Sequence, residues 1–279
     1  MTMNRRDFGR AVLLAGAAAL LPSSALLAAT EGPTLEAIRA RGALRIGVFA
    51  GTEPYYHKNL ATGEWEGFCV AMGQDLAQYI GVKLELVETT WGNSVIDLQS
   101  NKIDIMFGLS NNPERAKVVD FTKALMDNTF TLVARKDLEV TKWEEMNRPE
   151  MRVAVDLGST QDNFARKNLP NCTLVALKSA DETILALQSG RADAIIQVAL
   201  LAVVTTKHLA PNVKLIIPDP HGSQPTTIGV RRDPNGEFRD YVDAWLAERR
   251  GQGKVSGWIV DSLALVGVDK AALPASLTF

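Results

Sequence analysis

The chain contains an internal repeat, and this repeat restricts its possible folds more than any other feature. Residues 98–106 (Leu-Gln-Ser-Asn-Lys-Ile-Asp-Ile-Met) recur as residues 187–195 (Leu-Gln-Ser-Gly-Arg-Ala-Asp-Ala-Ile), and a shorter apolar pair precedes them at residues 44–48 and 151–155. Each long copy predicts the end of a helix, a polar turn and a strand buried on both faces. Two pairs in the same order indicate two related βαβ-type halves with parallel strands.

Local signals predict helices in both halves. Apolar residues recur every four positions from Phe68 to Ile80, which predicts an amphipathic helix that packs on a sheet. In the second half, Ser179 and Glu182 have the spacing of a capping box at a helix start, and Gly190 predicts the end of that helix.

The later part of the chain has no strand pattern that could support a third domain. A polar stretch at residues 135–137 interrupts the alternation of helix and strand, and a short strand pattern at 228–230 precedes helical stretches at 237–250 and 255–265. We expect these helices to cover the first half, so that the chain crosses twice between two lobes and forms a hinge. The predicted division places residues 30–134 and 227–279 in lobe 1 and residues 135–226 in lobe 2.

The first residues have the pattern of an export signal. Arg5 and Arg6 precede an apolar run at residues 11–21, and small residues follow at 23–29. This order predicts a twin-arginine signal peptide at residues 1–29 and a mature protein in the periplasm. The alternative is an uncleaved N-terminal anchor, although the run is short for a permanent membrane span. No later apolar stretch reaches spanning length, so we expect a mature chain that does not cross the membrane.

Composition argues against several other classes. Removing residues 1–29 takes away three arginines and one aspartate, so the formal net charge changes from −2 to −4. This mildly acidic chain has no basic run, which argues against nucleic-acid binding. Its two cysteines, Cys69 and Cys172, fall in different predicted lobes, and we expect both to be free, buried thiols. The three histidines are far apart and no C-x-x-C motif is present, so we expect no metal and no cofactor.

Two turns that follow predicted strands could form a site, because ligands of open α/β sheets bind beyond the carboxyl ends of the strands. The first turn begins at Gly108, where Asn112 is a candidate N-cap and Pro113 a candidate first helical residue. Arg115 then falls in the first turn, where backbone N–H groups and a guanidinium suit a carboxylate. The alternative is that Arg115 pairs with a surface acid such as Asp120.

The second turn runs from Asp156 through Gly158, Ser159 and Thr160. Glycine permits a tight turn there, and the hydroxyls and N–H groups face the strand ends. Alone this is an ordinary βα turn. Opposite Arg115 across a cleft, it would complete an anion clamp.

These segments resemble the polar amino-acid-binding family of periplasmic solute-binding proteins, and the resemblance covers essentially the whole mature chain. It is carried by residues 63–70, 91–104, 113–121, 158–161 and 188–193. The resemblance implies an α/β fold of two βαβ-type lobes joined by a two-strand hinge, like a type II periplasmic binding protein. Such a protein closes over one small ligand and passes it to the permease of an ABC transporter. We also expect a monomer.

The resemblance implies roles for particular residues. The family's carboxylate-binding arginine falls on Arg115, its supporting Ser/Thr on Ser110, and its second-lobe threonine on Thr160. Trp91 falls at a position that usually flanks the ligand. The alternative for Trp91 is a core aromatic residue.

Two positions depart from the family pattern. The aspartate that usually holds the α-ammonium falls on Val198. The aromatic residue that usually stacks on the ligand falls on Thr52, although Phe49, Tyr55 and Tyr56 lie nearby. A buried ammonium without an anionic partner is costly. Either the ligand lacks a conventional α-amine, or another acid replaces the aspartate. Asp156 is the candidate, although it could simply cap its own βα turn.

Three functions are compatible with this pattern. Transport is the leading hypothesis, in which the protein binds an amino acid or related small carboxylate reversibly and carries out no chemistry. Cyclohexadienyl and arogenate dehydratases resemble the same family and would use a cleft acid to protonate a leaving hydroxyl, but residues 198–202 contain no carboxylate. A ligand-sensing module for a membrane receptor would use the same site.

Overall fold

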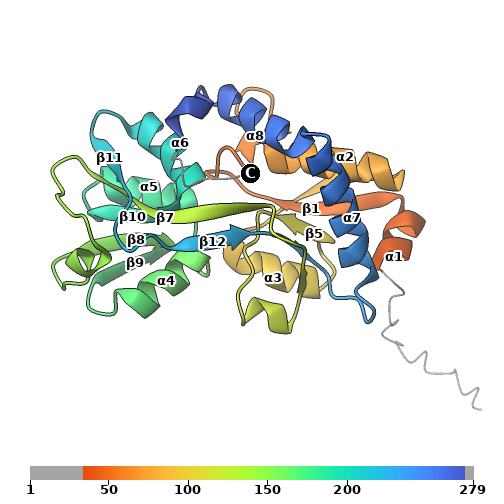
Figure 1. The fold of residues 1–279 in the computed structure, drawn as a ribbon, viewed down its shortest axis with the longest axis horizontal. Helices are drawn as coiled ribbons and strands as arrows, with labels where there is room; N and C mark the ends of the chain where they lie inside the picture. Colours follow the sequence, from red (N-terminus) through yellow and green to blue (C-terminus); the bar gives the residue numbers. More distant parts are fainter. Residues whose placement is uncertain (1–33, 274–279) are drawn as a thin grey trace, which may run out of the picture. The chain divides into compact units, whose positions relative to one another are not determined.

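The computed structural model describes residues 34–273, so the predicted export signal at residues 1–29 lies outside the described residues. Two main sheets, each flanked by helices, form the described fold (Figure 1). A short hairpin of β2 (His57–Lys58) and β3 (Trp65–Glu66) accompanies them. No helix among residues 34–273 is long and apolar enough to cross a bilayer.

The first sheet has the strand order β4-β1-β5-β13-β6. Strands β4 and β5 run parallel to β1, whereas β13 is antiparallel to both β5 and β6. Its strands are β1 (Ala43–Val48), β4 (Lys83–Glu88), β5 (Ile105–Phe107), β6 (Asp120–Phe121) and β13 (Ile228–Val230).

The second sheet has the order β11-β7-β10-β8-β9, and β12 pairs with β7 beyond this path. Strands β9 and β10 run parallel to β8, whereas β7 is antiparallel to β10 and β11. Its strands are β7 (Met126–Arg135), β8 (Arg152–Asp156), β9 (Thr173–Leu177), β10 (Ala194–Val198), β11 (Val213–Ile216) and β12 (Ser223–Thr226).

The internal repeat appears as a repeated topology. In the first sheet the order β4-β1-β5-β13 is three parallel strands followed by an antiparallel one, and β9-β8-β10-β7 has the same arrangement in the second sheet. The connecting helices correspond as well: α2 (Phe68–Ile80) with α4 (Thr160–Asn168), and α3 (Trp91–Gln99) with α5 (Ala180–Gln188). Asn101 and Gly190 occupy the same place in the two copies, and both adopt left-handed φ angles, 58° and 71°.

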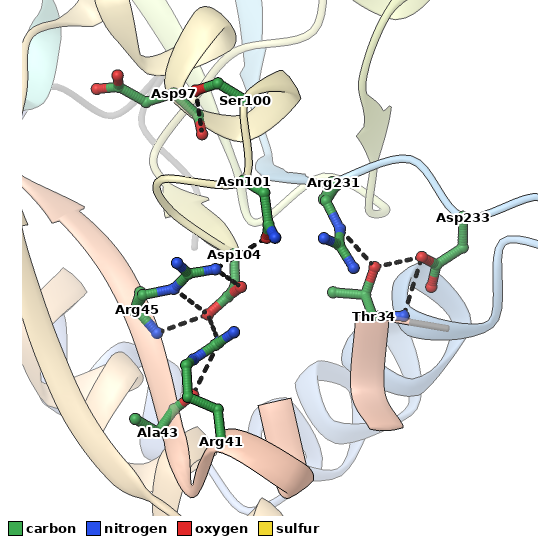
Figure 2. A network of polar contacts seen from close by, with 10 residues as sticks. All are labelled: Thr34, Arg41, Ala43, Arg45, Asp97, Ser100, Asn101, Asp104, Arg231 and Asp233. Carbon is green, nitrogen blue, oxygen red and sulfur yellow. Dashed lines mark hydrogen bonds and ion pairs between the residues drawn. The ribbon is translucent and has the colours of Figure 1, made fainter. Parts of the chain in front are cut away.

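The repeat also preserves an ion pair that ties two neighbouring strands together. Arg45 on β1 donates Nη2 to Asp104 Oδ1 at 2.8 Å, and Arg152 on β8 donates Nη2 to Asp193 Oδ1 at 2.7 Å. In each pair the backbone N–H of the arginine also donates to the aspartate. Figure 2 shows the first pair, in which Arg41 is a third donor group on Asp104. Both aspartates are buried. The two halves therefore have the same Arg-Asp pair at equivalent positions.

Two neighbouring strands form the crossings between the sheets. Residues Met126–Thr129 of β7 pair antiparallel with Ser223–Thr226 of β12, so the outgoing and returning segments lie side by side (Figure 1). Strand β7 then continues into the second sheet, and the polar stretch at residues 135–137 follows as it ends. The exact lobe boundaries stay a prediction.

The last two helices pack on helices of the first half. They are α7 (Glu237–Gly251) and α8 (Lys254–Leu265). Trp245 and Arg249 on α7 both donate to Asp75 Oδ1 on α2, at 2.8 and 2.6 Å. At the start of α1 (Thr34–Arg41), Thr34 donates to Asp233 just before α7, as Figure 2 shows.

Two local predictions need correction. Cys69 is buried and free, but Cys172 is free and only half-buried, because it lies in the turn between α4 and β9. Ser179 does cap α5 by accepting from the N–H of Glu182 at 3.3 Å. The Glu182 carboxylate, however, accepts from the N–H of Lys178 instead of Ser179, so the capping box is not closed as predicted.

The remaining helix of the second half is α6 (Ala199–Leu209), which follows β10 directly and packs against β7. Its first turn is almost entirely buried. Asn128 of β7, itself fully buried, accepts a long hydrogen bond from the N–H of Leu200 at 3.4 Å. The same amide donates to the Tyr55 hydroxyl at 2.9 Å, so one crossing strand contacts both halves of the fold.

Candidate ligand-binding site

A cavity lies where strand ends and helix starts of both sheets meet. The empty space between its walls, counted out to its opening, is about 330 Å³. Most of the predicted site residues line it: Trp91, Gly108, Ser110, Arg115, Ser159, Thr160 and Val198. The structure therefore brings together side chains that lie more than a hundred positions apart in the sequence.

Arg115 is the cationic group of this cavity. It is only 8% exposed, and its guanidinium donates Nη1 to the carbonyl oxygen of Ser110 and Nη2 to that of Gly158, both at 2.9 Å. Ser110 follows β5 of the first sheet and Gly158 follows β8 of the second, so Arg115 joins the two halves. Burial lowers the pKa of Arg115 to about 10, which still leaves the side chain cationic at neutral pH.

The local structure around Arg115 differs from the predicted helix. Residues Arg115–Lys117 form a single 3-10 turn and not a longer helix that starts at Pro113. The side chain of Asn112 accepts the N–H of Arg115 at 2.8 Å, but the residue directly before this turn is Glu114, so Asn112 is not its N-cap as predicted. Among the described residues, no carboxylate pairs with Arg115, in contrast to the alternative of a surface ion pair with Asp120, which instead receives Arg232.

Opposite Arg115, the cavity meets the start of α4. Gly158 adopts φ 75° in the preceding turn, and Ser159 caps the helix by accepting from the N–H of Asp162 at 3.1 Å. The N–H groups of Thr160 and Gln161 are the first of α4 and have no acceptor within the helix. Together with Arg115 they provide the donors that an anionic group needs.

An aromatic and apolar wall closes the rest of the cavity. Trp91 starts α3 and is 8% exposed; its ring meets Tyr55 edge-on with centroids 6.4 Å apart. Val198 ends β10 and is 6% exposed. The described lining of this cavity contains no Asp or Glu.

Four lining residues were not predicted as site residues: Tyr55, Gln161, Leu201 and Thr226. Gln161 directly follows Thr160, and Leu201 lies three positions after Val198, so the sequence contained a signal for both. Tyr55 carried a weaker signal, as an aromatic residue near Thr52. Thr226 carried none, because it reaches the cavity only through the path of the crossing strand β12.

Three predicted residues lie elsewhere. Thr52 is fully buried and donates its hydroxyl to the carbonyl oxygen of Phe49 at 3.1 Å. It therefore stabilises the turn after β1 and does not line the cavity of Arg115. Phe49 and Asp156 line a second cavity, whose empty volume to its opening is about 580 Å³. Phe49 contacts Trp91 edge-to-face with centroids 4.6 Å apart, so the two cavities adjoin at this pair.

Asp156 has an unusual environment. One carboxylate oxygen, Oδ1, is buried without a hydrogen-bond partner, although the backbone carbonyl accepts the N–H of Ser159 at 3.1 Å. Burial, with smaller contributions from the nearby carboxylates of Asp162 and Glu182, raises the pKa of Asp156 to about 7. The side chain therefore does not cap its own turn, which was the alternative role considered for it.

Comparison with known proteins defines the class to which this chain belongs. Residues 44–258 match the family of bacterial extracellular solute-binding proteins, family 3, and the chain belongs to this family. The predicted family and the type II periplasmic-binding-protein fold are thereby confirmed.

Particular relatives include both an enzyme and binding proteins. The chain is 28% identical to cyclohexadienyl dehydratase of Pseudomonas aeruginosa, over 88% of this chain and 92% of that protein. The structure of a solute receptor for L-cysteine of Neisseria gonorrhoeae is 28% identical with a TM-score of 0.78, over 88% of this chain and 100% of the other. An ancestral amino acid-binding protein, described as a precursor of cyclohexadienyl dehydratase, is 30% identical with a TM-score of 0.74, over 81% and 100%.

Proposed function

We propose that this protein binds an amino acid or a related small carboxylate between its two lobes in the periplasm and delivers it to the permease of an ABC transporter. In this proposal, residues 1–29 direct twin-arginine export and the mature protein acts as a monomer. Lobe 1 (residues 30–134 and 227–279) and lobe 2 (residues 135–226) close around the ligand on the hinge strands. Membership in a solute-binding family supports this function.

The observation that carries the proposal is Arg115. A guanidinium that is only 8% exposed and pairs with no described carboxylate lacks the counter-charge that buried cations normally have. The carboxylate of a ligand would supply this charge. It would also accept from the N–H groups at the start of α4 and from the hydroxyls of Ser110 and Thr160, with Trp91 against the body of the ligand.

The test is ligand binding by the mature protein after unfolding and refolding to remove any ligand carried through purification. A thermal-shift panel would compare amino acids with their α-keto and α-hydroxy counterparts, because a ligand at a hundredfold excess over its Kd stabilises a protein by about 2.7 kcal/mol. Arg115→Ala should abolish binding, and the exposed Arg191→Ala should not. Circular dichroism would verify folding of both variants. Unchanged affinity in Arg115→Ala would remove the proposed carboxylate clamp.

Delivery requires a separate test. The ligand-loaded protein should stimulate ATP hydrolysis by its reconstituted permease, and the ligand-free protein should do so less. A protein that binds its ligand but leaves every candidate permease unaffected would instead support a sensing role.

A second candidate function is acid-catalysed dehydration. The similarity to cyclohexadienyl dehydratase and the raised pKa of Asp156, about 7, favour it, because a carboxyl that stays protonated near neutral pH can act as a general acid. Binding remains the better supported function, since Asp156 lines the cavity beside that of Arg115 and not the same one. Incubation with the substrates of that enzyme, followed by ultraviolet absorbance, should give no aromatic product. Turnover that Asp156→Asn abolishes would establish the enzyme instead.

A further inference from the structure

The second cavity adjoins the first and has the opposite charge. Its lining includes three carboxylates, on Glu88, Asp156 and Asp181, and one cation, Lys58. Lys58 pairs with Glu88 at 2.6 Å. The carboxylates of Asp156 and Asp181 therefore remain without a cation, and neither makes a hydrogen bond or an ion pair within residues 34–273.

These two acids come from the second sheet and its helices, and they face the first turn of the other half. Asp156 ends β8, and Asp181 lies in the first turn of α5. The Asp181 carboxylate lies so close to Gly51 that a Cβ on this glycine would meet Oδ1. The ring of Phe49, which belongs to the same turn, lines the cavity with them. Asp156 is half-buried and Asp181 is exposed, and both lie beside this turn at the second cavity.

A partly desolvated carboxylate without a cationic partner is unfavourable. Burial raises the pKa of Asp181 and the nearby Glu53 raises it further, in the same direction as the shift of Asp156. A positively charged group in this cavity would reverse this penalty, because an opposite charge within a few ångströms favours the ionised carboxylate. The two cavities thus prefer charges of opposite sign, with Arg115 in the first and the two aspartates in the second.

We propose that the ligand carries a second, positively charged end, an ammonium or guanidinium group remote from its carboxylate, and that this end binds in the second cavity against Asp156 and Asp181. This inference rests on the proposed function, since it assumes that the carboxylate binds Arg115. The first cavity has Val198 and no described acid, so an α-ammonium next to the carboxylate would find no anionic partner there. The favoured ligand class is therefore an ω-amino or ω-guanidino carboxylic acid, recognised by its distal charge.

The test uses three acids with one carbon skeleton: pentanoate, 2-aminopentanoate and 5-aminopentanoate. Isothermal titration calorimetry with the mature protein should give the tightest binding for 5-aminopentanoate, by about tenfold or more over both others, as expected for a desolvated charge pair. The longer 6-aminohexanoate and 4-guanidinobutanoate, each compared with its uncharged analogue, would show which span between the two charges fits best.

Variants separate this inference from the proposed function. Asp156→Asn combined with Asp181→Asn should remove the preference for 5-aminopentanoate over pentanoate, and the exposed control Asp219→Asn should retain it. Arg115→Ala should abolish binding of every acid.

Each other outcome has a definite meaning. If pentanoate binds as tightly as its ω-amino derivative, or if 2-aminopentanoate binds best, the distal-charge inference is wrong and the carboxylate site stands. If the double variant keeps the preference, the distal charge is recognised elsewhere and the inference is again wrong. If no acid of any length binds, the proposed function fails with it.

Discussion

Replacing Asp156 by Asn should make the protein more stable, and the gain should depend on pH. In the folded protein, burial raises the pKa of Asp156 from 3.8 to about 7. The folded state therefore holds this proton to a higher pH than the unfolded chain, and the stability of the wild type falls as pH rises between these two values. The cost is absent near pH 4 and complete above about pH 7. An asparagine has no charge to desolvate and removes this pH-dependent cost.

The magnitude follows from the shift. A displacement of about three pKa units corresponds to about 4 kcal/mol, at about 1.36 kcal/mol per unit. This figure is an upper limit, because water still reaches part of the side chain. We expect the free energy of unfolding to rise by an amount on the order of 2 kcal/mol at pH 8. The difference in free energy of unfolding between variant and wild type at pH 8, minus the same difference at pH 4.5, isolates this contribution. The contributions of titratable groups that the substitution does not affect cancel.

Urea denaturation of the ligand-free mature protein at several pH values measures this quantity. Asp137→Asn is the matched control, because its side chain is 74% exposed and the substitution removes the same charge. The control should show a small difference that does not vary with pH. If Asp156→Asn and the control give parallel profiles, Asp156 is not the desolvated acid that the structure indicates, and the argument for a cationic ligand end loses its main support.

Two further predictions concern closure and the repeat. Gly92→Ala should stabilise α3 by about 0.5–1 kcal/mol in urea denaturation. It should nevertheless weaken ligand binding roughly tenfold in calorimetry, because the new Cβ would lie 3.1 Å from the carbonyl oxygen of Leu157 across the cleft. Equal or tighter binding would show that these turns do not meet in the closed form. Asp193→Ala should lower the free energy of unfolding by about 2 kcal/mol in urea denaturation. It removes the acceptor of the Arg152 backbone N–H and leaves the guanidinium with the carbonyl oxygen of Gly190. A change below about 0.5 kcal/mol would mean that solvent replaces this pair.

The topology could be predicted from the sequence because the repeat is a local pattern that occurs twice. The long copies contain the helix end, the turn and the strand, and Asn101 and Gly190 mark the left-handed residue at the same position in each. The Arg-Asp pairs lie within the same repeated segments, although only the structure shows that they bond across neighbouring strands. The course of β7 was harder to predict, because its ten residues carry no break where the chain passes between the sheets.

The candidate site was predictable to the extent that it consists of strand ends and helix starts. Arg115, Ser159 and Thr160 were found in this way, and the structure brings them into one cavity. The helix expected after Pro113 was wrong, since an Asn-Pro start predicts a cap but says nothing about how far a helix continues. Thr226 could not be found, because its position depends on the crossing strand and not on any local motif.

The division between two cavities could not be read from the sequence at all. Similarity to the family indicated that an acid is missing at Val198, and Asp156 was the candidate replacement because it ends a strand at the predicted cleft. That choice assumed that the two side chains share one cavity. The structure puts Val198 in the cavity of Arg115 and Asp156 in the adjoining one. Relative to the family pattern, the negative charge is therefore absent from the cavity of Arg115 and present in the adjoining cavity.

This displacement also bears on the choice between binding and catalysis. A general acid must reach the group that it protonates, whereas a counter-charge needs only to face the distal end of a ligand held elsewhere. Asp156 lies beyond the Phe49–Trp91 contact from Arg115, so a ligand with its carboxylate on Arg115 would present its far end, and not its α-carbon, to this acid. The raised pKa of Asp156 therefore supports the proposed counter-charge for the distal end of a ligand better than it supports a general acid.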